Sequence, residues 1–423
     1  MENNKTLATG IIFFFLVSIF MLVNGAYFNT MFRGTPLIIW RQLIWVIGLG
    51  VSFYYLKYYT VNRLVQIFKV ELYFFYAILL LSLITIALYH FNIIRISYAF
   101  WIYFSGVPFV CLPSIIQRSK LMQSKTFYSI FTYIGLFISI GLFLDYKSGG
   151  LYTTKYLGST MDIDALQGLL TNGRYCFLSE APTTFGVFYA FCMLCSLMRM
   201  YQARNFITRL ILLIISGSYI FGSWYTGSRQ IVAVLVLMYI LGIIIYLTRT
   251  KGSKAHIFVA GIIACAYVPT LFYSVMMSDP SYTTRFSTSN LEDDKRSDSW
   301  ERGFKETVLD DITITLFGKA VALCQGQKAS PSEITGSHYE NSFFARLSEC
   351  GIIGFALLLY PVYYIIRRIG KWDLFQFLIL MILCSYLIIS YVSPNGQHQT
   401  SQLAIYLTLG LYVARQYFDP EFS

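Results

Sequence analysis

Charged residues are scarce in this chain, at 13% of its 423 residues, and acidic residues are the scarcer sign. A soluble globular protein carries roughly 25% charged residues, so this composition excludes a chain whose surface is mostly in water. Internal repeats, low-complexity segments and glycine-rich phosphate loops are also absent from the sequence. What fills the chain instead is hydrophobic residues, at 56% of the total.

A disulfide framework is also missing, although the chain has 8 cysteines. Five of them lie inside apolar runs, namely Cys111, Cys192, Cys195, Cys265 and Cys384. The C-x-x-C spacing of Cys192 and Cys195 falls within one such run, so we interpret these thiols as small packing residues rather than a redox motif. Cys176 and Cys324 lie in polar segments and could pair with each other in an oxidising compartment.

The apolar runs are long enough to cross a membrane. A helix of about 20 apolar residues spans the hydrocarbon core, and the sequence predicts about twelve such helices. They lie at about 6–27, 36–56, 70–90, 97–116, 126–144, 181–198, 208–226, 229–248, 256–276, 350–366, 374–392 and 402–415. The runs are continuously apolar, which is unlike the alternation of barrel strands. Since residues 6–27 have no small-residue cleavage site, we expect a retained helix rather than a removed signal.

The basic residues predict the orientation. Lys and Arg concentrate in alternate short connections, which therefore face the cytoplasm. These residues are Lys57, Arg63, Lys69, Arg118, Lys120, Lys125, Arg199, Arg204, Arg209, Arg249, Lys251, Lys254, Arg367, Arg368 and Lys371. The opposite short connections hold only Arg33, Arg95 and Arg229. We therefore expect both termini inside, and we attribute the net charge of +11 to contacts with anionic membrane lipid. The charge is dispersed, which argues against a nucleic-acid partner.

The predicted fold is thus all-α, a polytopic integral membrane protein with two large outer loops. The chain divides into 1–144 (five spans), 145–180 (first outer loop), 181–276 (four spans), 277–349 (large outer loop) and 350–423 (three spans). Loops longer than about 15 residues are usually functional or disordered, and both of these keep aromatic and aliphatic residues.

The large outer loop contains a predicted amphipathic helix. Asp298 and Glu301 have the spacing of a capping box, and Trp300, Phe304 and Val308 then recur on one face. Such a helix can lie on the membrane surface, cover a site between the spans, or do both.

Several arginines lie at the outer level of the membrane. Arg229 falls between two adjacent predicted spans, and Arg41 lies near the outer end of the second span. An arginine at this depth either extends to the interface or binds an anion. Guanidinium groups bind phosphate in bidentate fashion, so their number here favours a lipid-linked phosphate.

A second group of polar residues precedes the tenth predicted span. On a helix His338, Asn341 and Ser342 share a face, and Glu349 follows further along the chain. A histidine beside a carboxylate at the mouth of a membrane helix is a candidate proton acceptor. We expect no metal site, because three or four ligands at a recognisable spacing cannot be assembled, and no other cofactor. Arg346 and Glu349 have the spacing of an i, i+3 ion pair.

Together these motifs resemble the O-antigen polymerase and O-antigen ligase superfamily of bacterial polysaccharide assembly. The resemblance is carried by Gly227-Ser228-Arg229, by the Arg296 to Trp300 and Leu316 to Gly318 motifs, and by His338-Tyr-Glu340-Asn341-Ser342 followed by Glu349-x-Gly351-Ile-Ile-Gly354. Ligases of this group typically show His-x-Asn. The extra Glu340 of this chain favours the polymerase branch.

The resemblance implies a glycosyltransferase at the periplasmic face of the bacterial inner membrane. An acceptor sugar hydroxyl would attack a glycan carried on undecaprenyl pyrophosphate and displace the lipid pyrophosphate. The implied roles are leaving-group stabilisation by Arg229, with Arg296, Arg285 and Arg41 as further anion ligands, and a base that is either Glu340 or His338. Arg174, Arg302, Asn341 and Arg346 are further substrate-binding candidates. A chain-length regulator protein is an implied partner.

Three other functions stay open at this point. A ligase that transfers finished polymer to lipid A core would share the fold and the arginines. A lipid-linked oligosaccharide transporter also often has about twelve spans, but transporters commonly show internal repeats and charges near the bilayer midplane. A membrane scaffold protein would not need arginines beside a histidine and a glutamate.

Overall fold

The computed structural model describes residues 2–58, 105–158, 161–249, 301, 305, 312–318, 342–367, 373–392 and 399–418. Within these residues every regular element is a helix and none is a strand, which confirms the all-α prediction for this part of the chain. The predicted spans at 70–90 and 256–276 lie outside the described residues, as does the part of 97–116 before residue 105.

The helices have the following bounds in chain order. The first group is α1 (Glu2–Val23), α2 (Gly25–Met31), η1 (Pro36–Ile39), α3 (Trp40–Tyr58), η2 (Val107–Cys111), α6 (Leu112–Ser119) and α7 (Ser124–Lys147). The second is α8 (Leu151–Leu157), α9 (Ile163–Thr171), η3 (Pro182–Thr184), α10 (Phe185–Gln202), α11 (Phe206–Tyr225) and α12 (Arg229–Arg249). The last is α17 (Ile312–Phe317), α18 (Ser342–Ile366), α19 (Leu374–Val392), α20 (Gln399–Val413) and α21 (Arg415–Phe418).

Three described helices are long and apolar enough to cross a membrane by length and composition: Lys5–Val23 of α1, Ser124–Lys147 and Phe206–Tyr225. Shorter apolar helices cover Pro36–Ser52, Ile231–Ile244 and Leu374–Ser390. These six coincide with six of the predicted spans, and the count of about twelve stays a prediction.

Two predicted boundaries are corrected. The run at 97–116 is not one regular helix in its described part, where the 3₁₀ turn η2 precedes α6. Pro108 and Pro113 each stand in the first turn of one of these elements, since a proline ring is accepted there but not within a helix. The helix that contains the predicted tenth span, α18, is described from Ser342, ahead of the apolar run predicted at 350–366, and has a break at Gly351.

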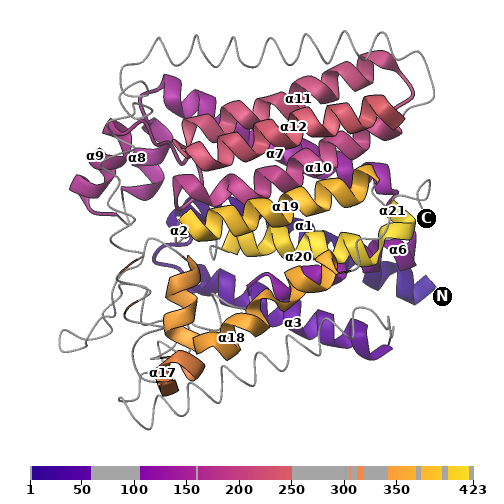
Figure 1. Ribbon diagram of the computed structural model, residues 1–423, viewed down its shortest axis with the longest axis horizontal. Coiled ribbons are helices and arrows are strands. Elements are labelled where there is room, and N and C mark those ends of the chain that lie inside the picture. The colour runs from indigo at the N-terminus through magenta and orange to yellow at the C-terminus, as the bar shows by residue number, and fades with distance from the viewer. Residues whose placement is uncertain are drawn as a thin grey trace.

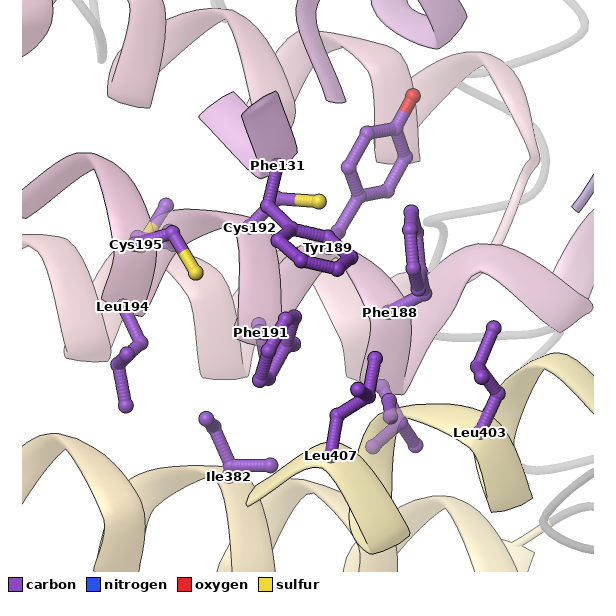
Figure 2. Packing of buried hydrophobic residues seen from close by; sticks show 14 of the residues in the cluster. Phe131, Phe188, Tyr189, Phe191, Cys192, Leu194, Cys195, Ile382, Leu403 and Leu407 are labelled. Carbon is purple, nitrogen blue, oxygen red and sulfur yellow. The ribbon is translucent and has the colours of Figure 1, made fainter. Parts of the chain in front are cut away.

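The bundle is built around α10. This helix is buried over almost its whole length, from Phe185 to Met198, as expected of a helix that is apolar on all sides. It contacts α7, α11, α12, α19 and α20, which surround it in Figure 1. Figure 2 shows side chains of α7, α10, α19 and α20 meeting in this core, where the rings of Phe131 and Phe191 lie edge to face at 5.0 Å.

The C-x-x-C motif serves packing in this core. Cys192 and Cys195 are buried free thiols on α10. A methyl group at Gly135 of α7 would lie 2.9 Å from Cβ of Cys192 and 2.9 Å from the ring of Tyr219. The small residues therefore let α7, α10 and α11 approach closely, as in many membrane helix pairs, and the packing interpretation of the two cysteines is confirmed.

Different helices lie at the two ends of the bundle. The beginning of α1, α6 and α21 lie at one end, and α2, α8, α9 and α17 lie at the other (Figure 1). The first end is held by the Tyr128 hydroxyl, which donates to the carbonyl of Phe418 at 3.4 Å, and by an ion pair between Asp373 and Arg415. The N-terminal end of α1 and the C-terminal helix α21 thus lie at the same end of the bundle (Figure 1).

Candidate functional site

Residues 145–180, the predicted first outer loop, fold into the two short helices α8 and α9 and an ordered segment between α9 and η3, which we call the return segment. Asp145, at the end of α7, is fully buried and organises this loop. Its carboxylate accepts hydrogen bonds from the backbone N–H groups of Tyr152 (2.8 Å), Thr153 (3.2 Å) and Phe177 (3.0 Å), and from the Thr153 hydroxyl (2.5 Å). A buried carboxylate needs such donors, so one side chain joins α7, the start of α8 and the return segment.

Cys176 is part of the same network. Its backbone N–H donates to the Thr153 hydroxyl at 2.9 Å, and its side chain is a buried free thiol. The alternative of a Cys176–Cys324 disulfide is therefore wrong for this structure. Burial, and secondly the negative charge of Asp145, raises the pKa of the Cys176 thiol well above its usual range.

The return segment places Arg174 beside the turn that precedes Arg229. The backbone N–H of Tyr175 donates to the carbonyl of Tyr225, the last residue of α11, at 2.9 Å. The rings of Tyr146 and Tyr225 stack at 5.0 Å, and Tyr175 lies edge-on to Tyr146 at 5.6 Å. Arg174, which is half-buried, therefore lies next to a tyrosine cluster at the C-terminal ends of α7 and α11.

The predicted short turn between two spans is confirmed. Gly227 has φ +68°, a left-handed conformation that favours glycine, and its N–H donates to the carbonyl of Trp224 at 2.8 Å. The next helix, α12, begins at Arg229. For Arg229 the structure describes the backbone. It lies in the first turn of α12, at the same end of the bundle as Arg174.

Arg41, near the start of α3, forms an ion pair with Glu180 at the end of the first outer loop. The Glu180 carboxylate also accepts hydrogen bonds from the amides of Asn29 of α2 (2.5 Å) and Gln399 of α20 (3.3 Å). Trp40 donates from its indole nitrogen to the Asn29 side-chain oxygen at 3.1 Å, and the guanidinium carbon of Arg41 lies 5.0 Å from the centroid of the Trp40 ring. We refer to Asn29, Trp40, Arg41, Glu180 and Gln399 as the Glu180 cluster.

The Glu180 cluster gathers residues that are far apart in the sequence. Arg41 precedes Glu180 by 139 positions, and Gln399 follows it by 219. The side chains of Arg41 and Glu180 are 18% and 22% exposed, so an incoming group can still reach the pair. Glu180, Asn29 and Gln399 were not predicted as site residues, because an acid at the end of a loop and two amides at helix ends carry no local motif.

The beginning of α18 carries the other predicted ion pair. Arg346 and Glu349 are joined, with side-chain exposures of 1% and 0%, so the expected i, i+3 pair is confirmed and is buried. The contact that the structure assigns to Arg346 is thus a carboxylate of its own helix. Its role as a substrate ligand stays a prediction.

Two of the motifs quoted from the sequence lie against each other. A methyl group at Gly318 would overlap the backbone of Glu349, and one at Gly351 would overlap the backbone of Leu316. Gly318 has φ +84°, and Gly351 has φ 65° with ψ −175°, a conformation that is essentially restricted to glycine. The Leu316–Gly318 motif of the large outer loop is therefore pressed onto the beginning of α18.

The other predicted site residues lie outside the described residues. They are Arg285, Arg296, Arg302, His338, Glu340 and Asn341. Of the predicted amphipathic helix, the structure describes Glu301 and Lys305. Glu301 and Lys305 form an exposed ion pair at 2.6 Å, which lowers the pKa of Glu301.

No group of three potential metal ligands among His, Cys, Asp and Glu occurs within the described residues. Comparison with known proteins identifies no matching protein family model and no matching curated protein.

Proposed function

We propose that this protein is a polysaccharide polymerase that joins repeat units carried on undecaprenyl pyrophosphate at the outer face of a bacterial inner membrane. The proposal rests on the resemblance of its motifs to the O-antigen polymerase and ligase superfamily. The carrying observation is the contact between Tyr175 and Tyr225 at 2.9 Å. This contact brings the segment that contains Arg174 next to the turn that precedes Arg229. Both arginines were predicted as site residues on separate sequence features.

The chemistry needs cationic groups at this end of the bundle. The acceptor hydroxyl oxygen forms a bond to the anomeric carbon of the donor, and the bond from that carbon to the pyrophosphate oxygen breaks. Negative charge then develops on undecaprenyl pyrophosphate. Arginines that are already oriented stabilise such a charge without reorganisation, and we assign this role first to Arg229, with Arg174 and Arg41 as further anion ligands.

The acceptor proton needs a base in the same step. His338 or Glu340 takes this proton in our proposal, and a general base accelerates such a step by about 10²–10⁴-fold. Asn341 orients the base or a sugar. Arg285, Arg296, Arg302 and Arg346 complete the proposed set of substrate ligands. A chain-length regulator protein is the proposed partner.

The test is deletion of the gene in its native host, followed by gel analysis of the surface glycolipids. The deletion strain is complemented with the intact gene, with an Arg229→Ala copy, and with an Arg33→Ala copy as the matched control. Arg33 is an exposed arginine at the same end of the bundle that is given no role here. We expect single-repeat glycolipid in the deletion strain, with the ladder restored by the intact and Arg33→Ala genes but not by Arg229→Ala at equal protein level.

The other outcomes identify the other functions. Bare core with long polymer retained on the lipid carrier would indicate a ligase. A loss of all lipid-linked sugar from the outer leaflet would indicate a transporter. A normal ladder from Arg229→Ala would remove the role of Arg229, and an unchanged ladder in the deletion strain would exclude a polymerase of this surface glycan.

A further inference from the structure

Arg41 is an anion-ligand candidate that has a partly exposed carboxylate as a partner. Glu180 meets its guanidinium, and the pair is 18% and 22% exposed. An arginine whose charge is balanced in this way attracts an anion less strongly than an isolated one, because the carboxylate repels the same anion. The affinity of Arg41 for a phosphate group therefore depends on Glu180.

The neighbours of Glu180 hold it in place independently of Arg41. The amides of Asn29 and Gln399 donate to its two carboxylate oxygens at 2.5 and 3.3 Å. Asn29 is itself oriented by the indole N–H of Trp40 at 3.1 Å. Both amides are neutral, so they fix the carboxylate without cancelling its charge.

Close packing also keeps Arg41 next to this carboxylate. Gly25 of α2 stands against the pair, and a methyl group there would lie 2.9 Å from Nη2 of Arg41 and 3.3 Å from Cδ of Glu180. The ring of Trp40 lies on another side of the guanidinium. The geometry is thus built around the pair by α2, α3, the first outer loop and α20, and it does not depend on one flexible contact.

We propose that Glu180 is a positioning residue whose negative charge limits the affinity of Arg41 for the lipid-linked pyrophosphate. The inference rests on the proposed function. Each transfer leaves undecaprenyl pyrophosphate, which keeps the pyrophosphate group of the substrate and carries a further negative charge on the oxygen that the glycan has left. Tight binding of an anion in both substrate and product lowers KM but does not accelerate the reaction, and it slows product release. A fixed carboxylate beside the arginine keeps this ground-state binding weak.

The experiment measures binding of undecaprenyl pyrophosphate in detergent micelles to the purified full-length protein. Glu180→Gln removes the charge while keeping an amide oxygen as an acceptor. Interactions between partly exposed charges are weak, so we expect Glu180→Gln to bind the probe about two- to fivefold more tightly. The gain should disappear in the double variant Arg41→Ala/Glu180→Gln. Loss of a merely structural contact would weaken binding rather than strengthen it.

Asp162→Asn is the matched control. Asp162 is an exposed acid of the same loop that caps α9, so its substitution makes the same change in net charge and asparagine still caps the helix. Tightening equal to that of Glu180→Gln would mean a general charge effect and would overturn the inference, as would unchanged or weaker binding by a folded Glu180→Gln protein.

Two further experimental outcomes also test the inference. If Glu180→Gln does not fold, Gln399→Glu tests the same charge in the opposite direction: weaker binding supports the inference and unchanged binding overturns it. If the wild-type protein shows no saturable binding of the probe, the pyrophosphate site itself is wrong. That result is distinguishable from binding by the wild type that Glu180→Gln leaves unchanged.

Discussion

Asp145 is a single residue on which the first outer loop depends. Its fully buried carboxylate accepts bonds from two backbone positions of α8, from the Thr153 hydroxyl and from Phe177. Asp145→Asn keeps the shape of the side chain but replaces one acceptor oxygen with an NH₂ donor. That donor would face the N–H and hydroxyl donors that surround the carboxylate. Hydrogen bonds to charged groups contribute about 1.5–3 kcal/mol each, so we expect a loss of about 2–4 kcal/mol, measured as a lower Tm in detergent and faster proteolysis of residues 145–180.

The control for this residue is again Asp162→Asn, which should leave the free energy of unfolding unchanged within about 0.5 kcal/mol because asparagine is an equally good helix cap. A Tm of Asp145→Asn equal to that of the wild type would show that the loop does not need the charge.

Cys176 leads to a prediction about reactivity. Thiolates and not thiols react with maleimides, and burial together with Asp145 raises the pKa of this thiol. Burial and the raised pKa both lower the amount of reactive thiolate at Cys176 in the folded protein. We expect the peptide that contains Cys176 to stay unlabelled by maleimide between pH 7 and 9 in mild detergent, as followed by mass spectrometry, and to be labelled after denaturation. Labelling without denaturation would contradict the buried position.

At the scale of elements, the joint between α17 and α18 leaves no room for a side chain at Gly351. Gly351 interrupts α18 with a conformation essentially restricted to glycine, against the backbone of Leu316. Gly351→Ala combines backbone strain with a steric overlap, and we expect it to destabilise the protein by about 2–4 kcal/mol, measured as a lower Tm. If the joint positions the large outer loop, the same variant should also reduce polymer formation.

Gly168→Ala serves as the matched control for Gly351→Ala. Gly168 lies inside α9 and has no atom within 4 Å of an added methyl group. Alanine should stabilise this helix by about 0.5–1 kcal/mol. Equal Tm values for the two variants would mean that the close approach of α17 to α18 is not formed in solution.

Elements also show where prediction from the sequence fails. The continuous span at 97–116 was wrong because Pro108 and Pro113 each begin a new helical element, whereas hydropathy averages over both. The turn before Arg229 was correct because Gly227 is a local signal for the end of a helix. The first described turns of α18 precede the apolar run predicted at 350–366, because tertiary packing rather than an apolar run buries them.

At the scale of the whole molecule, the basic residues predict which end of the bundle faces the cytoplasm. Alkaline phosphatase is active only outside the cytoplasm. We therefore expect activity from a fusion after residue 161, between α8 and α9, and none from a fusion after residue 121, between α6 and α7. A fluorescent protein fused after residue 423 should fluoresce inside. The reverse pattern at all three positions would invert the proposed orientation. A C-terminus outside together with an N-terminus inside would exclude an even number of spans.

The helical class, the apolar bundle and the turn at 226–229 were determined by the sequence itself, because each depends on composition or periodicity over a few turns. The tertiary structure alone decided which residues meet at the outer end. Glu180 contacts Arg41 and Gln399 across 139 and 219 positions, and Gly351 meets Leu316 only because two backbones pack without side chains between them. Such contacts follow from how whole helices pack, and no local pattern encodes them.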